Sequence, residues 1–235
     1  MLFEVLLYSF LSGITVFIGA LSSYYFEQNV HNQILKDKII HFLVAFGTGI
    51  MLSAIAFVLI PKGMENLDIL TSSSVFISGA IAFYFLDSYI QKSNTNISQV
   101  LAMLLDFIPE SIALGALFVY DHEVGILLAL FIGLQNLPES FNSYIDLRRS
   151  RFSIKSSLVL LFFLSFIGVI FSSLGYFFLD DKIEVTSGLM LFASGGILYL
   201  IFQDIAPSIK TKNSRFIAMG VNLGFVIGMF GEALI

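Results

Sequence analysis

Eight apolar runs, each about 20 residues long, dominate this sequence and limit what it can fold into. A run of that length is what an α-helix needs to cross the hydrocarbon core of a bilayer. The runs cover residues 2–26, 39–61, 69–90, 98–120, 123–145, 156–179, 185–208 and 214–235. Because backbone polar groups inside a bilayer must bond within the protein, we predict an all-α, polytopic membrane bundle of eight transmembrane helices. We expect residues 1–235 to form a single domain.

Composition agrees with this class of protein. The chain has 235 residues, of which 57% are hydrophobic and 12% charged, and its mean hydropathy is +0.90. A soluble domain of this size could not bury so much apolar surface. The absence of cysteine excludes disulfides and thiolate metal ligands. The first run is too long for a signal peptide and lacks a basic segment before it, so we expect it to be retained.

Lysine and arginine gather on one side of the predicted membrane. Ten of the twelve lie in the first, third, fifth and seventh loops: Lys36, Lys38, Lys92, Arg148, Arg149, Arg151, Lys155, Lys210, Lys212 and Arg215. Loops rich in these residues stay in the cytoplasm, so we expect both termini on the outer side of a bacterial inner or plasma membrane. The other loops carry an excess of acid, which would attract cations.

Two of the central runs are interrupted by the same short insert. Residues 106–111 read Asp-Phe-Ile-Pro-Glu-Ser, and residues 135–140 read Gln-Asn-Leu-Pro-Glu-Ser. In each, a polar residue stands four positions before a glutamate, so the two side chains share one helix face. The proline before each glutamate cannot donate to the carbonyl four residues back. This frees the carbonyl oxygens of Leu105 and Leu134.

Asp106, Glu110, Gln135 and Glu139 therefore fall close to the membrane midplane, where ionisable residues are costly and are usually functional. Neither helix core contains a lysine or arginine that could neutralise the acids, so a bound cation is their natural partner. The structural alternative is that protonated acids only hold helices together.

A second repeat relates the second span to the seventh. Four residues match without gaps at an offset of 146: Phe46, Gly49, Leu52 and Pro61 with Phe192, Gly195, Leu198 and Pro207. These spans cross the membrane in opposite directions, as do the two that carry Pro-Glu-Ser. We therefore predict an inverted 3+2+3 repeat, with halves 1–90 and 156–235 flanking a central helix pair, 98–145. Transporters often bind substrate at such a repeat interface.

The paired Pro-Glu motifs, the eight spans, the outward termini and the glycine-rich second and seventh spans resemble the ZIP family of divalent-metal transporters. That family carries His-Asn-x-Pro-Glu-Gly in its fourth span and His/Gln-Asn/Glu-x-Pro-Glu/His in its fifth. The resemblance implies that Asp106, Glu110, Gln135 and Glu139 form the metal site. It also implies a transporter rather than an enzyme, with no organic cofactor.

The sequence departs from the family at several positions. Asp106 stands where the family has histidine, and Phe107, which cannot bind metal, stands where it has asparagine. The sixth span contains no carboxylate, so we do not expect a binuclear site. An all-oxygen ligand set favours Mn²⁺, Fe²⁺ or Mg²⁺, whereas the family resemblance favours zinc. Both assignments stay open.

Three further polar residues are weaker candidates for metal ligands: Asn136, Asn142 and Asp204. Asn136 follows Gln135 in the second insert, and Asn142 lies one turn after Glu139, where it could line the inner path. Asp204, near the inner end of its span, could help the metal leave or simply lie at the interface. We interpret the three histidines, His31, His41 and His122, as structural or solvated residues.

The function best indicated is import of a divalent cation, zinc or else manganese or iron, by alternating access. One alternative is a transport-inactive, structural or receptor-like homologue. Another is an intramembrane enzyme that uses Glu110 and Glu139 as acid and base, although the core contains no histidine and no nucleophile–base pair. The expected partners are the lipid bilayer and the cation. A homodimer stays open, and nothing in the net charge of −5 indicates nucleic acid.

Overall fold

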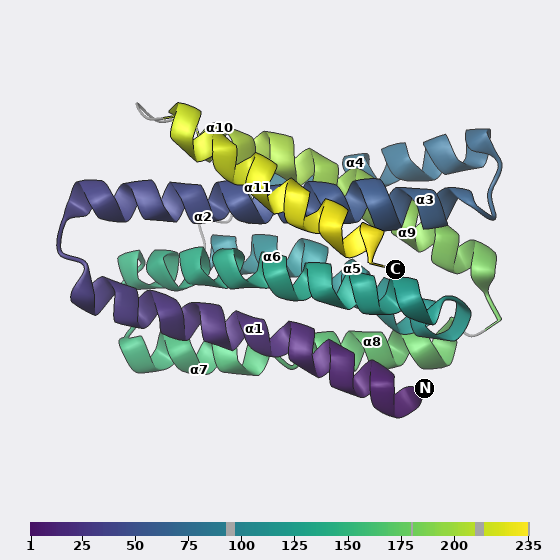
Figure 1. Cartoon of the computed structure of the whole chain (residues 1–235), viewed down its shortest axis with the longest axis horizontal. Helices are drawn as coiled ribbons and strands as arrows, with labels where there is room; N and C mark the ends of the chain where they lie inside the picture. The colour runs from purple at the N-terminus through teal and green to yellow at the C-terminus, as the bar shows by residue number, and fades with distance from the viewer. Residues whose placement is uncertain (93–96, 180, 210–213, 235) are drawn as a thin grey trace.

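The computed structural model describes residues 1–92, 97–179, 181–209 and 214–234, without the side chains of residues 204, 205, 208, 209 and 214. Within these residues the regular structure is helical and contains no strand. Eight helical segments there are long and apolar enough to cross a membrane, which confirms the predicted all-α polytopic bundle. The segments run up and down along one long axis (Figure 1).

The helices follow one another in the order of the predicted spans. The first five spans are α1 (Leu2–Asn29); α2 (Gln33–Ala54), η1 (Ile55–Leu59) and α3 (Ile60–Met64); α4 (Ile69–Lys92); α5 (Ser98–Tyr120); and α6 (His122–Arg149). The last three are α7 (Ile154–Leu164) and α8 (Ile167–Phe178); α9 (Ile183–Leu200), η2 (Ile201–Ile205) and α10 (Ala206–Ile209); and α11 (Ser214–Ala233).

Two spans differ from the prediction by more than a few residues at an end. The second begins at Gln33 rather than at residue 39, because the Asn32 side chain caps the helix by accepting the Leu35 N–H at 3.1 Å. The sixth is interrupted between α7 and α8, where the Ser165 hydroxyl donates to the Phe162 carbonyl at 2.5 Å. Such bonds from serine to the preceding turn often bend a helix.

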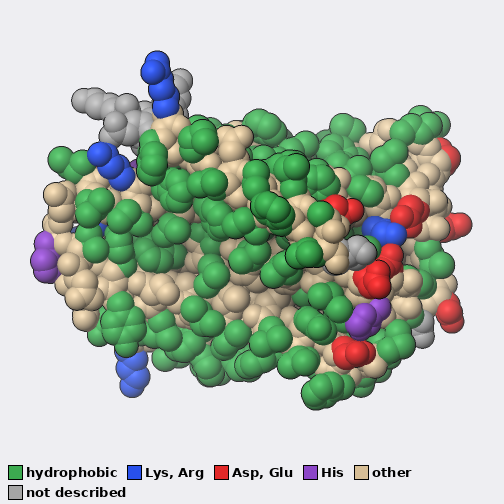
Figure 2. All heavy atoms as spheres, in the orientation of Figure 1, with side chains coloured by type: hydrophobic (Ala, Val, Ile, Leu, Met, Phe, Trp, Pro, Cys, Tyr) green, Lys and Arg blue, Asp and Glu red, His purple; other side chains and the backbone are tan. Residues whose placement is uncertain are grey.

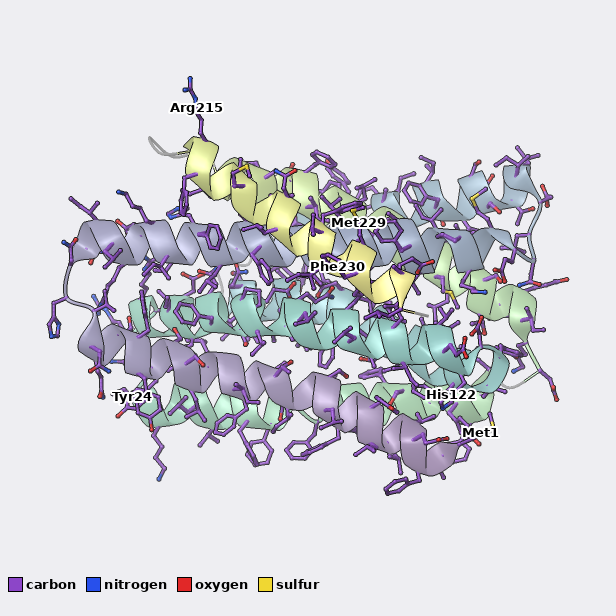
Figure 3. All side chains as sticks on the ribbon, in the orientation of Figure 1. Met1, Tyr24, His122, Arg215, Met229 and Phe230 are labelled. Atoms are coloured by element: carbon purple, nitrogen blue, oxygen red, sulfur yellow. The ribbon has the colours of Figure 1, made fainter. Side chains whose placement is uncertain are left out.

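The surface is apolar along its sides and charged at its two ends. Figure 2 shows hydrophobic side chains over most of the visible face, with acidic side chains gathered toward one end. We call this the acidic end; it carries Glu4, Glu65, Asp68, Asp121 and Glu123. The opposite, basic end carries Lys36, Lys38, Lys92, Arg148 and Arg149. In Figure 3, Tyr24 and Arg215 lie toward the basic end, and Met1 and His122 toward the acidic end.

The helices pack as two groups. The central group contains α1, α5, α6, α7 and α8, and its closest pairs are α1 with α6 and α5 with α8. The flanking group contains α2, α3, α4, α9, α10 and α11, and its closest pairs are α2 with α11 and α4 with α9 (Figure 1). The groups meet where α2 packs on α6 and α9 packs on α5. Both inserts therefore lie in the central group, on the two helices that contact the flanking group.

Paired glycines bring the helices of the flanking group into backbone contact. Gly49 and Gly224 lie where α2 meets α11, and Gly195 and Gly79 lie where α9 meets α4. A Cβ at any of the four would lie 1.9–2.1 Å from a carbonyl oxygen of the facing helix. Small residues let membrane helices approach this closely. Gly49 and Gly195 are themselves related by the offset of 146.

A π-helical turn precedes each of the related prolines. η1 ends two residues before Pro61, and η2 ends two residues before Pro207. Because proline cannot donate and its ring crowds the preceding turn, the helix widens there to bonds five residues long, such as Ile60 N–H to Ile55 O. α3, which contains Pro61, lies toward the acidic end, and α10, which contains Pro207, lies toward the basic end (Figure 1). Equivalent features in opposite directions are what an inverted repeat produces.

Candidate functional site

Both inserts remain helical. α5 continues through Pro109 and α6 continues through Pro138. The hydroxyls of Ser111 and Ser140, which follow the two glutamates, each donate to the carbonyl four residues earlier, at 2.7 and 2.6 Å. These bonds use the serine side chains locally. Of the other polar residues in the two inserts, Glu110 and Gln135 are directed toward each other.

Glu110 and Gln135 join the two inserts directly. Gln135 Nε2 donates to Glu110 Oε2 at 2.5 Å, and the two residues are 1% and 0% exposed. The remaining side-chain oxygen of each has no hydrogen-bond partner in the described part of the chain. A buried oxygen without a partner loses its hydration and gains nothing in return, so this arrangement is costly as it stands.

Glu139 and Asp106 lie beside this pair. Both carboxylate oxygens of Glu139 are buried, and neither finds a hydrogen-bond partner among the described residues. The Glu139 carboxylate interacts electrostatically with Asp106 and Glu110, so the three acids form one cluster. Asp106 is 2% exposed and accepts the Phe107 backbone N–H at 2.8 Å. The Phe107 ring is buried against Gly168 of α8.

The cluster offers only oxygen donors, and it is not closed around a single point. Among the residues that the structure describes, no group of three or more His, Asp and Glu side chains is arranged to hold a metal ion. That Asp106, Glu110, Gln135 and Glu139 share one ion therefore stays a prediction. The structure brings Gln135 onto Glu110 and places the other two acids within electrostatic reach.

A cavity of about 460 Å³ extends from the cluster toward the basic end. Asp106 and Glu139 line it deep in the bundle, and Asn142 lies beside them. Asp37 and Arg149, at the basic ends of α2 and α6, line its mouth. The cluster can therefore be reached from the basic end.

Apolar side chains fill the bundle between the cluster and the acidic end. Leu114, Leu117 and Phe118 of α5 are at most 2% exposed, and so are Leu127 and Phe131 of α6. These residues belong to the main hydrophobic core. Close packing of this kind leaves no space for a hydrated ion.

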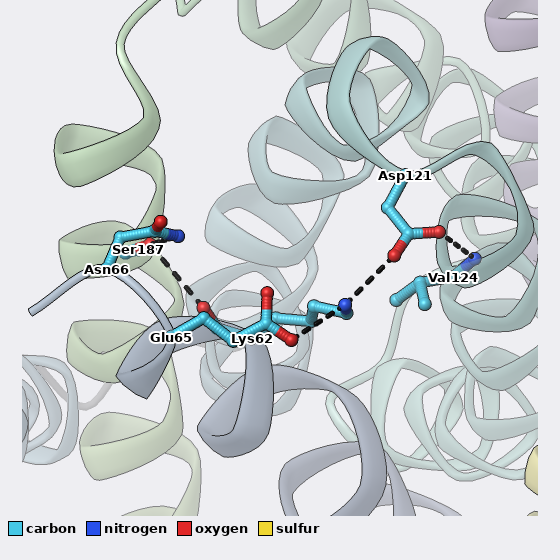
Figure 4. Close-up of polar contacts among 6 residues, drawn as sticks. All are labelled: Lys62, Glu65, Asn66, Asp121, Val124 and Ser187. Carbon is cyan, nitrogen blue, oxygen red and sulfur yellow. Dashed lines mark hydrogen bonds and ion pairs between the residues drawn. The ribbon is translucent and has the colours of Figure 1, made fainter.

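A charged contact joins the two helix groups at the acidic end. Lys62 of α3 pairs with Asp121, which precedes α6, at 2.9 Å, and with Glu65 at 2.8 Å (Figure 4). Asp121 also caps α6 by accepting the Val124 N–H at 3.2 Å. Partial burial by itself would raise the pKa of Asp121. The hydrogen bonds from Lys62 and from the Val124 backbone N–H, together with the positive charge of Lys62, outweigh burial and lower that pKa.

The weaker candidates have different positions. Asn136 is fully buried, and its Nδ2 donates to the Ser12 carbonyl of α1 at 3.4 Å, so it ties two helices of the central group together. Asn142 lines the cavity, in agreement with its expected position. The side chain of Asp204 lies outside the described residues.

Two cavity-lining residues were missed as candidates. Asp87 of α4 is 4% exposed and accepts hydrogen bonds from Gln91 at 3.0 Å and from the Tyr199 hydroxyl at 3.2 Å. An acid within an apolar run is itself a sequence signal, but Asp87 stands near the end of its run, where acids are usually solvated. His41, interpreted as structural, lines the same cavity.

Fold and site together define a multi-pass membrane protein with a buried carboxylate and amide cluster that a cavity reaches from one end. In comparisons with known proteins, no family model and no curated sequence matches this chain. Any assignment of function therefore rests on the residues of the site.

Proposed function

We propose that this protein carries a divalent metal cation across a cell membrane by alternating access, binding it through Asp106, Glu110, Gln135 and Glu139. The observation that carries the proposal is the set of buried oxygens on Glu110, Gln135 and Glu139 that find no hydrogen-bond partner among the described residues. No lysine or arginine lies in the core of α5 or α6 to compensate the acids. Carboxylates at this depth need protons or a cation, and a divalent ion could satisfy several of them together.

The cavity and the closed acidic end indicate that the cluster can be reached from one side of the membrane only, as alternating access requires. By the distribution of lysine and arginine, the basic end faces the cytoplasm and both termini face outward. The conformation described above would then be inward-facing, with Asp106 and Glu139 accessible from the cytoplasm.

The division into two helix groups supports the mechanism. The central group carries the cluster, and the flanking group supplies the opposite wall of the cavity through α2 and α4. Movement of one group against the other would close the cavity at the basic end and break the Lys62–Asp121 contact at the acidic end. Alternating access in repeat-built transporters commonly works by such a movement around a fixed site.

The ligand atoms of the proposed site indicate which metal ions it would bind. Carboxylate and amide oxygens favour Mn²⁺ and Fe²⁺, while zinc also accepts carboxylates and is favoured by the resemblance to ZIP transporters. We therefore propose a divalent transition-metal cation, with zinc and manganese as the ions to test first.

Uptake into vesicles tests the proposal. The purified full chain in liposomes should accumulate Zn²⁺ or Mn²⁺, and Glu110→Gln or Glu139→Gln should abolish uptake while retaining side-chain size. Glu123→Gln, at an exposed position in the first turn of α6 at the acidic end, is the matched control and should transport as the wild type does. Metal binding without uptake would indicate the transport-inactive alternative. A wild-type protein that neither binds nor transports these ions would overturn the proposal.

A further inference from the structure

His41 differs in position from the other two histidines, all three of which the structure describes. It lies half-buried on α2 and lines the cavity that leads to the cluster. His31 is exposed between α1 and α2, and His122 lies at the acidic end, 3.5 Å from Glu4. His41 is therefore the one of the three histidines that lies between the cluster and the basic end.

The tautomer of His41 is set by its own helix. Its Nδ1 lies 2.5 Å from the backbone carbonyl oxygen of Asp37. A carbonyl can only accept, so Nδ1 carries the hydrogen, and the neutral ring keeps its lone pair on Nε2. Metal-binding histidines generally have this arrangement, with one ring nitrogen bonded to a carbonyl and the other available to the metal.

Asp37 supplies a carboxylate at a suitable spacing. It stands four residues before His41, so the two side chains share one face of α2, and both line the cavity. Asp37 Oδ1 accepts a hydrogen bond from Gln33 Nε2 at 2.9 Å, which orients the carboxylate. The spacing is the same as that of Asp106 with Glu110.

The charge of the cavity favours a cation. Asp87, Asp106, Glu139 and Asp146 also line it. Among the lining residues that the structure describes, Arg149 is the one lysine or arginine, and it lies 3.4 Å from Asp146. Acidic walls around a confined space raise the local concentration of cations. A volume of about 460 Å³ also leaves room for an ion with several waters, each of which occupies about 30 Å³ in the liquid.

We propose that Asp37 and His41 form a second divalent-cation site at the basic mouth of the cavity, with His41 Nε2 and the Asp37 carboxylate as its protein ligands. Water completes the coordination, so the site binds more weakly than a closed one and releases its ion readily. An imidazole with a carboxylate suits Zn²⁺ in particular. That this site receives the ion on its way from the midplane cluster to the cytoplasm rests on the proposed function. The binding of a cation by Asp37 and His41 does not.

Nitrogen NMR of the histidine rings tests the binding directly. The full chain in detergent micelles, with ¹⁵N-labelled imidazoles, should give signals from only three rings, which single substitutions assign. On addition of Zn²⁺, the Nε2 signal of His41 should shift at a concentration that leaves His31 and His122 unchanged. Asp37→Asn keeps an acceptor for Gln33 but removes the charge. It should raise the Zn²⁺ midpoint at His41 by about tenfold or more.

The control separates this site from the midplane cluster. Glu139→Gln removes one charge from the cavity wall but no ligand of this site, so it should change the Zn²⁺ midpoint of His41 by much less than Asp37→Asn does, even though it abolishes uptake under the proposed function. If His41 responds to Zn²⁺ and the wild type shows no uptake, the second site stands and the transport function fails. The second site is refuted if His41 shifts no earlier than His31, or if Asp37→Asn leaves the midpoint unchanged.

Discussion

The glycine contacts of the flanking group allow a quantitative prediction with an internal control. Gly195 packs on α4, where an added Cβ would lie 1.9 Å from the Phe76 carbonyl oxygen. Its repeat-related partner, Gly49, packs on α11, where a Cβ would lie 2.0 Å from the Val221 carbonyl oxygen. Gly188, on the same helix as Gly195, has nothing within 4 Å of its Cβ position.

The expected magnitude follows from these distances. To restore the 3.4 Å at which ordinary contact begins, α9 and α4 must separate by about 1.5 Å. The opposing atoms are helix backbone and cannot turn aside, so we take the upper part of the usual overpacking range, about 3 kcal/mol. Alanine gains about 1 kcal/mol over glycine in a helix, which leaves Gly195→Ala destabilised by about 2 kcal/mol. Gly188→Ala meets no obstacle and should be stabilised by about 1 kcal/mol.

Reversible unfolding of the purified chain in mixed micelles, followed by helix content while the denaturing detergent is increased, measures this difference. We expect Gly195→Ala and Gly49→Ala to unfold earlier than the wild type by similar amounts, and Gly188→Ala to unfold slightly later. If Gly195→Ala is as stable as Gly188→Ala, then α9 and α4 do not pack through this glycine. If only one of Gly195→Ala and Gly49→Ala is destabilised, the two helix contacts are not equivalent.

Three further predictions concern transport. Asp106→His replaces a carboxylate with an imidazole nitrogen, so competition uptake should shift toward Zn²⁺ relative to Mn²⁺; an unchanged ratio would exclude Asp106 as a ligand. Uptake should weaken as the pH falls, because protons compete with the metal for the same carboxylates, and a flat profile from pH 5 to 8 would contradict this. Asp121→Asn keeps the cap on Val124 but removes the charge that Lys62 contacts. An exposed ion pair contributes about 0–1 kcal/mol, so we expect up to about a fivefold faster labelling of a Leu117→Cys probe from the acidic side. The contact with Lys62 helps to lower the pKa of Asp121 below the ordinary value of about 3.9. Asp121 is therefore charged at neutral pH, and the wild-type ion pair is lost only when the pH falls through this lowered pKa. Wild-type labelling at neutral pH as fast as that of Asp121→Asn would show that the contact does not hold the acidic end closed.

The spans and the two inserts could be predicted from the sequence because both depend on local properties. Hydropathy over about 20 residues determines which segments cross a bilayer, and the helical period determines that residues four apart share a face. That was sufficient to identify Asp106, Glu110, Gln135 and Glu139 as candidates. The extended start of α2 and the break after α7 were missed, because each depends on one side chain, Asn32 or Ser165, bonding to nearby backbone.

The contacts between helices could not be predicted in the same way. The bond from Gln135 to Glu110, the ion pair of Lys62 with Asp121 and the cavity beside His41 each join residues from different helices. A sequence does not record which helices pack together, nor their relative height and rotation. Here close glycine contacts determine how the helices of the flanking group pack. His41 and Asp87 lie near the ends of their spans, where polar residues are usually solvated. Only the packing of α2 and α4 around the cavity gives these two residues a place along a path to the buried acids.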